Sequence, residues 1–140
     1  MREILFRGIR KDTHEWIYGF YGEYFDGKKN VPCISVVDNR VITGSLCYEV
    51  IPETVGQFTG LTDKNGVRIY ENDIVRYTNL AFNPNIGRFE NMIFTSAVTY
   101  NLDNGCFSPF EPDTFESYIR AENVEVIGNR FDNPELLKGK

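Results

Sequence analysis

Four oxygen-bearing side chains between residues 63 and 73 form the first group in this sequence whose types and spacing could bind a metal ion. They are Asp63, Asn65, Glu71 and Asp73. An EF-hand calcium loop needs oxygen ligands at alternate positions, a central glycine and a bidentate glutamate at the twelfth position. In this chain Gly66 comes too early and Val67 stands where a ligand is needed. The segment is therefore better explained by turns than by a calcium site, and we expect no metal.

The chain has one histidine and three cysteines, the residue types that commonly bind zinc or act as nucleophiles. They are His14, Cys33, Cys47 and Cys106. A lone histidine without nearby cysteines cannot complete a zinc site, and scattered cysteines are usually small buried side chains. A Cys–His pair is formally available for nucleophilic catalysis, but its spacing does not favour one. We expect no catalytic residue, no cofactor and no enzyme activity, with an enzyme that has an unrecognised site as the alternative.

A glycine-rich phosphate loop is not predicted. Gly56 and Gly60 bracket the tripeptide Gln57-Phe58-Thr59, but no Lys-Ser or Lys-Thr follows them and no long helix is expected there. These glycines more often permit a bulge or a close approach of two backbones.

Aromatic and basic side chains gather in the first 30 residues, a combination that could stack on nucleic-acid bases. The aromatic residues are Trp16, Tyr18, Tyr21, Tyr24 and Phe25, and the basic residues are Arg7, Arg10, Lys28 and Lys29. Aromatic side chains beside cations can bind single strands, but alternating aromatics on a strand more often form a core or a subunit interface. We expect a core or an interface, and nucleic-acid binding is the alternative.

The charge distribution weighs against nucleic acid as the partner. The formal net charge is -5 and the pI is about 4.9. Residues 1–50 carry seven basic and seven acidic side chains, whereas residues 101–140 carry four basic and eight acidic ones. Binding to phosphates depends on Lys and Arg that release counterions, so a basic patch would have to come from the N-terminal half.

Short strands and turns dominate the predicted secondary structure. Period-two alternation and turn residues predict strands over 3–9, 16–21, 31–37, 40–43, 47–51, 55–60, 68–70, 74–78, 92–102 and 124–127. Turns are predicted at 26–27, at 63–66 and at 104–105. A capping box at 113–116 and the Asn133-Pro134-Glu135 segment could each begin a short helix. Residues 79–91, rich in Asn with one Pro and one Gly, read as a long irregular loop.

These elements predict a mainly β protein, more specifically a β-rich α+β fold. We expect residues 1–51 to form an N-terminal region of antiparallel strands that packs on residues 52–140, the two parts making one compact unit. Many short strands at regular turn spacing are typical of a roll or small barrel, here with one or two short helices. An odd cysteine count fits a reducing cytoplasm, and no apolar run approaches the roughly 20 residues that span a bilayer, so we expect a soluble cytoplasmic protein.

Several short segments carry recognisable motifs: 6–8, 16–19, 53–61, 63–66, 69–75, 126–129 and 133–137; we refer to them as the signature segments. Together they resemble the YopX family of phage and prophage proteins. The spacers at 22–47 and 79–123 are variable in the family that the chain resembles. One residue departs from the pattern, because Asn72 stands where the family usually has glycine. Asn tolerates positive φ better than other non-glycine residues, so we expect Asn72→Gly to be neutral or stabilising.

The resemblance implies a setting and a fold but no chemistry. It implies a C-terminal part like an SH3-type roll, a phage or prophage gene expressed in the cytoplasm of a bacterial host cell, and self-association. It carries no catalytic residues over to this chain. Our leading hypothesis is a non-enzymatic interaction module that forms a homo-oligomer and has a phage or host protein as a further partner. A nucleic-acid-binding module is the second hypothesis, and neither a membrane nor a cofactor is expected.

Overall fold

The computed structural model describes residues 3–36, 46–110 and 119–138. The predicted strand at 40–43 and the capping box at 113–116 lie outside these residues. The chain divides into two compact units, Met1–Gly60 and Leu61–Lys140, and each is described by itself. The described residues form antiparallel sheets and three one-turn 3₁₀ helices, which confirms the mainly β expectation. The SH3-like roll and the boundary after residue 51 stay predictions.

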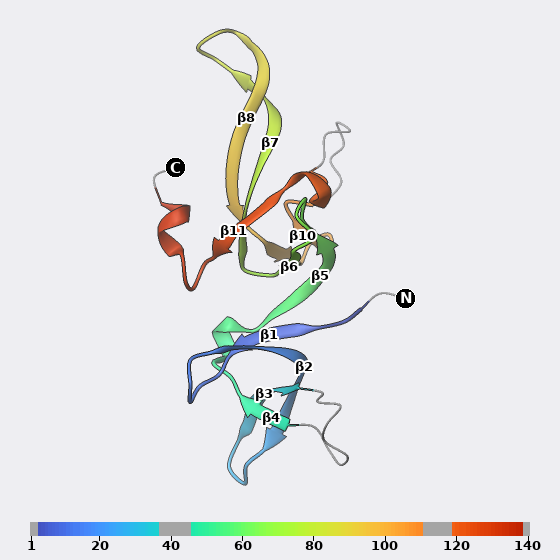
Figure 1. The fold of residues 1–140 in the computed structure, drawn as a ribbon, viewed down its shortest axis with the longest axis vertical. Helices are drawn as coiled ribbons and strands as arrows, with labels where there is room; N and C mark the ends of the chain where they lie inside the picture. The colour runs from blue at the N-terminus through green and yellow to red at the C-terminus, as the bar shows by residue number, and fades with distance from the viewer. Residues whose placement is uncertain (1–2, 37–45, 111–118, 139–140) are drawn as a thin grey trace. The chain divides into compact units, whose positions relative to one another are not determined.

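The first unit is an antiparallel sheet with a 3₁₀ turn at its end (Figure 1). Its elements are β1 (Phe6–Ile9), β2 (Trp16–Phe25), β3 (Asn30–Val36), β4 (Leu46–Glu49), η1 (Pro52–Thr54) and most of β5 (Gly56–Thr62). In the sheet they lie in the order β4-β3-β2-β1-β5. The first half of β2 pairs with β1 and its second half pairs with β3. Buried side chains of this unit include Val31, Cys33, Ile34 and Val50.

Strand β2 is longer than the alternation of its residues predicts. The expected strand ends at Tyr21, but β2 continues to Phe25 because Tyr24 and Phe25 pair with the start of β3. The turn at Asp26 is confirmed: its Oδ1 accepts hydrogen bonds from the backbone N–H groups of Lys28 at 2.8 Å and Lys29 at 3.0 Å. This local network fixes the hairpin that places Lys29 beside β3.

The second unit contains a three-stranded sheet, a short hairpin and two 3₁₀ turns. Its elements are β6 (Arg68–Tyr70), β7 (Asp73–Asn83), β8 (Arg88–Ala97), β9 (Thr99–Asn101), β10 (Cys106–Ser108), η2 (Ala121–Asn123), β11 (Glu125–Asn129) and η3 (Pro134–Leu137). The sheet order is β11-β7-β8, and β9 pairs with β10. Its buried core is Ile69, Val75, Val98, Ile119 and Val124. The single strand predicted over 92–102 is wrong, because fully buried Val98 separates β8 from β9.

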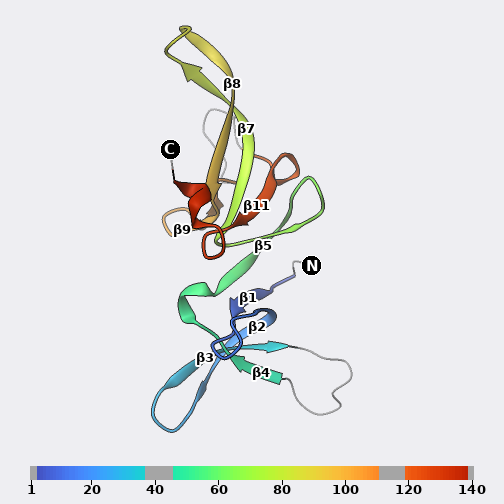
Figure 2. The ribbon, with the colours of Figure 1, turned by 60° about the vertical axis from the view of Figure 1, so that its left-hand side comes forward.

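The irregular loop predicted over 79–91 is also wrong. These residues belong to a long hairpin in which β7 and β8 pair in continuous register from Ile74↔Ala97 to Asn83↔Arg88. The turn occupies only residues 84–87, where Pro84 and Gly87 lie. Asn79 and Asn91 are inside the strands, where the alternation of their apolar neighbours outweighs their own turn preference. Figures 1 and 2 show the hairpin extending beyond β11 in both views.

The C-terminal segment forms the expected short helix, here one 3₁₀ turn, but with a different cap. Asn133 makes no side-chain cap to η3; instead its Oδ1 accepts a hydrogen bond from Asn129 N at 3.2 Å. Gly128 makes room for this contact, because a Cβ there would lie 2.4 Å from Asn133 Oδ1. The predicted N-cap is therefore wrong, since the side chain of Asn133 bonds to the end of β11.

Candidate interaction surface

The outer part of the β7–β8 hairpin presents large apolar side chains to solvent. We call residues 77–94 the β7–β8 arm. Its exposed apolar residues are Leu80 at 56%, Phe82 at 53%, Phe89 at 64% and Ile93 at 73% of their full exposure. The register places Phe82 opposite Phe89, with ring centroids 5.4 Å apart, and pairs Leu80 with Asn91 and Thr78 with Ile93. Since paired residues share a face of a ribbon, these side chains form one surface, the arm's apolar face.

The opposite face of the arm is polar or half-buried. Tyr77 and Phe94 stack there with centroids 5.8 Å apart, and nearer the turn Asn83 Nδ2 donates a hydrogen bond to Glu90 Oε1. The alternation between exposed and half-buried residues runs along both strands. The side chains that an ordinary sheet would bury thus lie on the face turned to solvent.

The arm has no third strand along most of its length. β11 pairs with β7 only between Asp73 and Arg76, so beyond Arg76 the described strands form a two-stranded ribbon. Such a ribbon is marginally stable in water unless its apolar face packs against something else. The arm therefore has two properties of a binding element. Its apolar face is exposed to solvent, and a partner packed on that face would stabilise the two-stranded ribbon.

The size and charge of the apolar face fit an interface. A large aromatic side chain exposes 150–250 Å² when free, so the four partly exposed residues present roughly 400–500 Å² of apolar surface. That is in the range of the largest apolar patch on a typical monomer, which is often functional. Between Thr78 and Ile93 this face carries no charged residue. A partner would therefore cover it without desolvating a charge.

The carboxylates considered for calcium bind backbone N–H groups. Asp63 Oδ1 accepts hydrogen bonds from Asn65 N at 2.8 Å and Val67 N at 2.9 Å, and its Oδ2 accepts one from Val126 N at 3.0 Å. Burial opposes ionisation of Asp63, but the three N–H donors outweigh it and hold its pKa below the usual value. Asp73 Oδ2 accepts from Tyr70 N at 2.7 Å. In the part of the chain that the structure describes, no three potential ligand side chains gather for a metal.

Two of the three cysteines are brought together in the first unit. Cys33 is buried in β3 and Cys47 is exposed in β4. Burial of Cys33, together with its hydrogen bond to the Cys47 thiol, raises its pKa to about 11. A thiol that stays protonated is a poor nucleophile. His14 lies exposed in the β1–β2 turn with φ 61°, and Cys106 is half-buried in β10.

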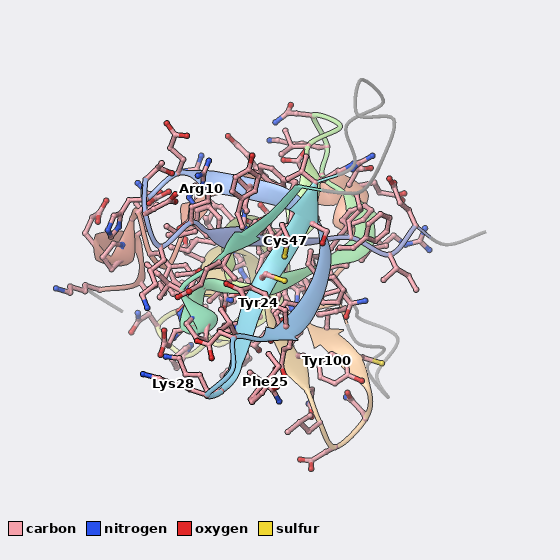
Figure 3. The ribbon with its side chains drawn as sticks, turned by 90° about the horizontal axis from the view of Figure 1, so that it is seen from below. Arg10, Tyr24, Phe25, Lys28, Cys47 and Tyr100 are labelled. Atoms are coloured by element: carbon pink, nitrogen blue, oxygen red, sulfur yellow. The ribbon has the colours of Figure 1, made fainter. Side chains whose placement is uncertain are left out.

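The N-terminal aromatic residues are mostly exposed, so a core role is wrong for them within the described residues. Tyr18, Tyr21, Tyr24 and Phe25 are between 40% and 67% exposed; Figure 3 labels Tyr24 and Phe25, with Lys28 in the same hairpin. Trp16 alone is half-buried, under the Arg7 guanidinium at 4.6 Å. An interface or nucleic-acid role for the exposed ones stays a prediction.

Two of the basic side chains in this region are paired with acids. Arg10 bonds to Asp12 at 2.7 Å and lies 4.0 Å from the Tyr48 ring centroid. Lys11 bonds to Glu49 at 2.9 Å. These pairs lower the net positive charge that phosphates would meet.

Comparison with known proteins identifies the family. The model of the YopX protein family matches residues 5–138 of this chain. The chain belongs to the YopX family. A solved structure, the crystal structure of protein EF1440 from Enterococcus faecalis, is similar with a TM-score of 0.53 and 22% identity, over 99% of this chain and 100% of that one. At that identity the likeness shows the fold alone. No curated protein matches the chain.

The YopX signature segments contact one another in the second unit. Asn72 has φ 76°, which confirms the turn expected from the family glycine. Its backbone O accepts from Arg130 N at 3.0 Å and its Oδ1 from Arg130 Nη1 at 3.3 Å. Asp63 Oδ2 accepts a hydrogen bond from Val126 N, and the missing side chain of Gly128 leaves space for Asn133. In this unit the YopX motifs hold strands and turns in register.

The arm is the feature that sequence reasoning missed in this YopX chain. Its signal is present: Leu80 and Phe82 alternate before the turn, and Phe89 and Ile93 lie at matching positions after it. The density of Asn residues obscured that alternation. The helices of the described segments are single 3₁₀ turns, and none of them could cross a membrane.

Proposed function

We propose that this YopX-family protein is a non-enzymatic interaction module that self-associates through the apolar face of the β7–β8 arm during phage or prophage development. The observation that carries the proposal is the uncovered apolar face formed by Leu80, Phe82, Phe89 and Ile93. The phage setting rests on the family resemblance. The candidate chemical residues support a non-enzymatic role, because Asp63 and Asp73 are engaged by backbone N–H groups.

A second copy of this chain is the occupant that best fits the face. A partner with charged residues would bury them against apolar side chains without compensation. Another copy of the same face brings no charge and offers the same alternating aromatic and aliphatic groups. Two arms related by a two-fold axis would each contribute the same residues, as in most homodimers.

The area of the contact is compatible with such a dimer. Two apolar faces would bury roughly 800–1,000 Å² together if each contributes 400–500 Å². Stable interfaces bury about 1,200–2,000 Å² in total, so the apolar face would form the centre of the contact and the rest of the arm its rim. Burial would also remove the penalty of an isolated two-stranded ribbon.

Light scattering on the full chain with a double substitution on the apolar face tests the proposal. Threonine keeps strand propensity but removes the large apolar groups, so Phe89→Thr with Ile93→Thr should leave the hairpin folded and weaken association. The wild type is expected to show at least twice the chain mass of 16.2 kDa at about 100 μM. The double variant is expected to show the chain mass.

Arg88→Thr is the matched control, because Arg88 is exposed near the same turn but its register partner Asn83 places it on the opposite face. It should keep the wild-type mass. Circular dichroism checks that all three proteins are folded. A wild type that stays monomeric near 1 mM contradicts self-association and leaves a different phage or host protein as the partner. A folded double variant with the wild-type mass contradicts the role of the apolar face.

A further inference from the structure

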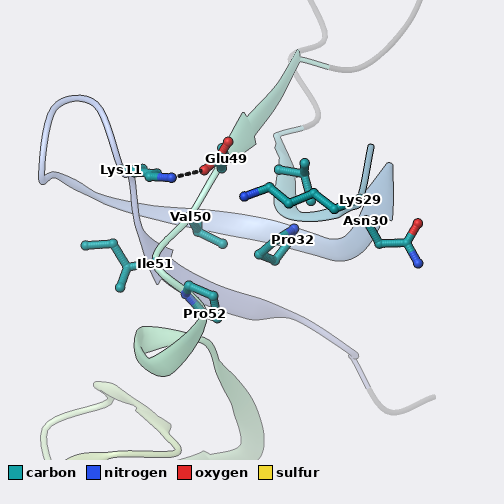
Figure 4. A pocket seen from close by; sticks show the side chains of 9 residues that line it. Lys11, Lys29, Asn30, Pro32, Glu49, Val50, Ile51 and Pro52 are labelled. Carbon is teal, nitrogen blue, oxygen red and sulfur yellow. Dashed lines mark ion pairs between the residues drawn. The ribbon is translucent and has the colours of Figure 1, made fainter. Parts of the chain in front are cut away.

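A small pocket in the first unit is lined by residues from three separate segments. Its volume is about 280 Å³, near the lower end of the range for small-molecule sites. The β1–β2 turn contributes Lys11, the start of β3 and the turn before it contribute residues 29–32, and the segment from β4 to η1 contributes residues 49–52. All of these residues lie within Met1–Gly60, and Figure 4 shows their arrangement.

The floor and walls of the pocket are mostly apolar. Val31 is 2% exposed and Val50 is fully buried, while Pro32 and Pro52 have no backbone N–H to offer. The neighbouring N–H groups are already used, since Val50 N donates to Pro32 O at 3.2 Å and Ile51 N to Ile9 O at 2.9 Å. Recognition of a polar ligand group must therefore come from the side chains at the rim.

The charged side chains that line the pocket are two lysines and one glutamate. Lys11 and Glu49 form an ion pair at 2.9 Å. The backbone of Lys29 is fixed by Asp26, whose N–H donates to Lys29 O at 3.1 Å and whose Oδ1 accepts from Lys29 N at 3.0 Å. Within the described ranges no carboxylate lies at ion-pair distance from the Lys29 ammonium. Figure 4 shows this side chain reaching toward Glu49 and Val50.

We propose that this pocket binds a small carboxylic acid with an apolar body. The Lys29 ammonium donates hydrogen bonds to the carboxylate. The apolar body packs on Pro32, Ile51 and Pro52, the apolar lining residues that keep accessible surface. The Lys29 ammonium attracts a carboxylate more strongly than a neutral group and repels a cation. This site is separate from the arm, so its test does not depend on self-association.

The test is a titration of the ¹⁵N-labelled full chain with 3-phenylpropionate, and with 3-phenylpropanamide as the neutral probe of the same shape. The acid is expected to shift the amide signals of Lys29, Val31, Val50 and Ile51 in a saturable way, and the amide to bind at least fivefold more weakly. Lys29→Gln should weaken binding of the acid at least fivefold.

Lys28→Gln is the control, since Lys28 lies in the same turn but does not line the pocket; it should change the affinity less than twofold. Equal binding of acid and amide would overturn the proposal. So would equal loss in the two lysine variants, shifts that map outside the pocket, or no saturable binding up to about 10 mM acid.

Discussion

Asp63 connects two signature segments that are far apart in the sequence. One carboxylate oxygen holds the turn at residues 63–67, and the other holds β11 through Val126 N. The side chain is only 5% exposed. Its charge is compensated by backbone N–H groups, an arrangement that favours the ionised form. Asp63 therefore stabilises the fold of the second unit.

Replacing Asp63 by Asn should destabilise the protein by about 2 kcal/mol, because hydrogen bonds to a charged acceptor are worth about 1.5–3 kcal/mol and the new NH₂ group would face an N–H donor. Urea unfolding at pH 7 measures the loss. Asp103→Asn is the control, since Asp103 lies exposed in the β9–β10 turn; it should change stability by less than about 0.5 kcal/mol.

The stability difference between the wild type and Asp63→Asn should depend on pH in a definite direction. The pKa of Asp63 is lowered in the folded state from its ordinary value of 3.8. Its contribution to stability is thus fully present above about pH 4 and is lost as the pH falls through the lower, folded-state pKa. The stability difference between wild type and Asp63→Asn should shrink in that acidic window. A difference that stays constant from pH 7 to pH 2 would show that the carboxylate charge is not involved.

At the scale of elements, the β6–β7 turn depends on the left-handed conformation of Asn72. Its φ of 76° is unfavourable for residues with an ordinary Cβ. Asn72→Ala should cost about 1 kcal/mol. Asn72→Gly should be neutral or slightly stabilising, because the relief of strain offsets the loss of the 3.3 Å contact with Arg130 Nη1. Thermal melting of both variants decides it, and a clear fall in Tm for the glycine variant would contradict this assignment.

Local turns were predictable from the sequence, and this is why β6 (Arg68–Tyr70) and the turn before it match the expectation. The hydrogen bonds that form this turn join residues close in sequence: Asp63 Oδ1 accepts from the backbone N–H groups of the residues two and four positions later. Asn133 was misassigned because its partner depends on the space left by Gly128, a fact of packing. Val98 broke the expected strand because it enters the core and its N–H donates to Asp73 O.

The β7–β8 arm could not be predicted from local sequence preferences. Asn, Pro and Gly predict turns by local preference, but pairing between β7 and β8 determines the structure at Asn79 and Asn91. The turn expected at residues 63–66 is confirmed by the hydrogen bonds that Asp63 Oδ1 accepts from Asn65 N and Val67 N. No local pattern could show that Leu80 and Phe89 are left uncovered, because exposure depends on which strands reach the arm.

At the scale of the whole molecule, family membership and surface function involve different residues. Two signature segments of the second unit bond to one another through Asp63, whose Oδ2 accepts from Val126 N, and Asn72 bonds to Arg130 in the short stretch between the last two segments. The apolar face of the arm lies at residues 80–93, and the pocket of the first unit is lined by residue 11 and by residues 29–32 and 49–52. All of these positions lie outside the signature segments. The YopX motifs thus predict the scaffold, while the proposed binding surfaces lie in segments that these motifs do not cover.

Amide hydrogen exchange at two protein concentrations tests the central claim most directly, because it reports on the arm and on association together. At about 5 μM the amides of the arm should exchange fast, as expected for a two-stranded ribbon. At about 500 μM their exchange should slow at least tenfold, while the amides of β11 and of the first unit remain unchanged. Exchange from residues 77–94 that is independent of concentration would contradict self-association through the arm.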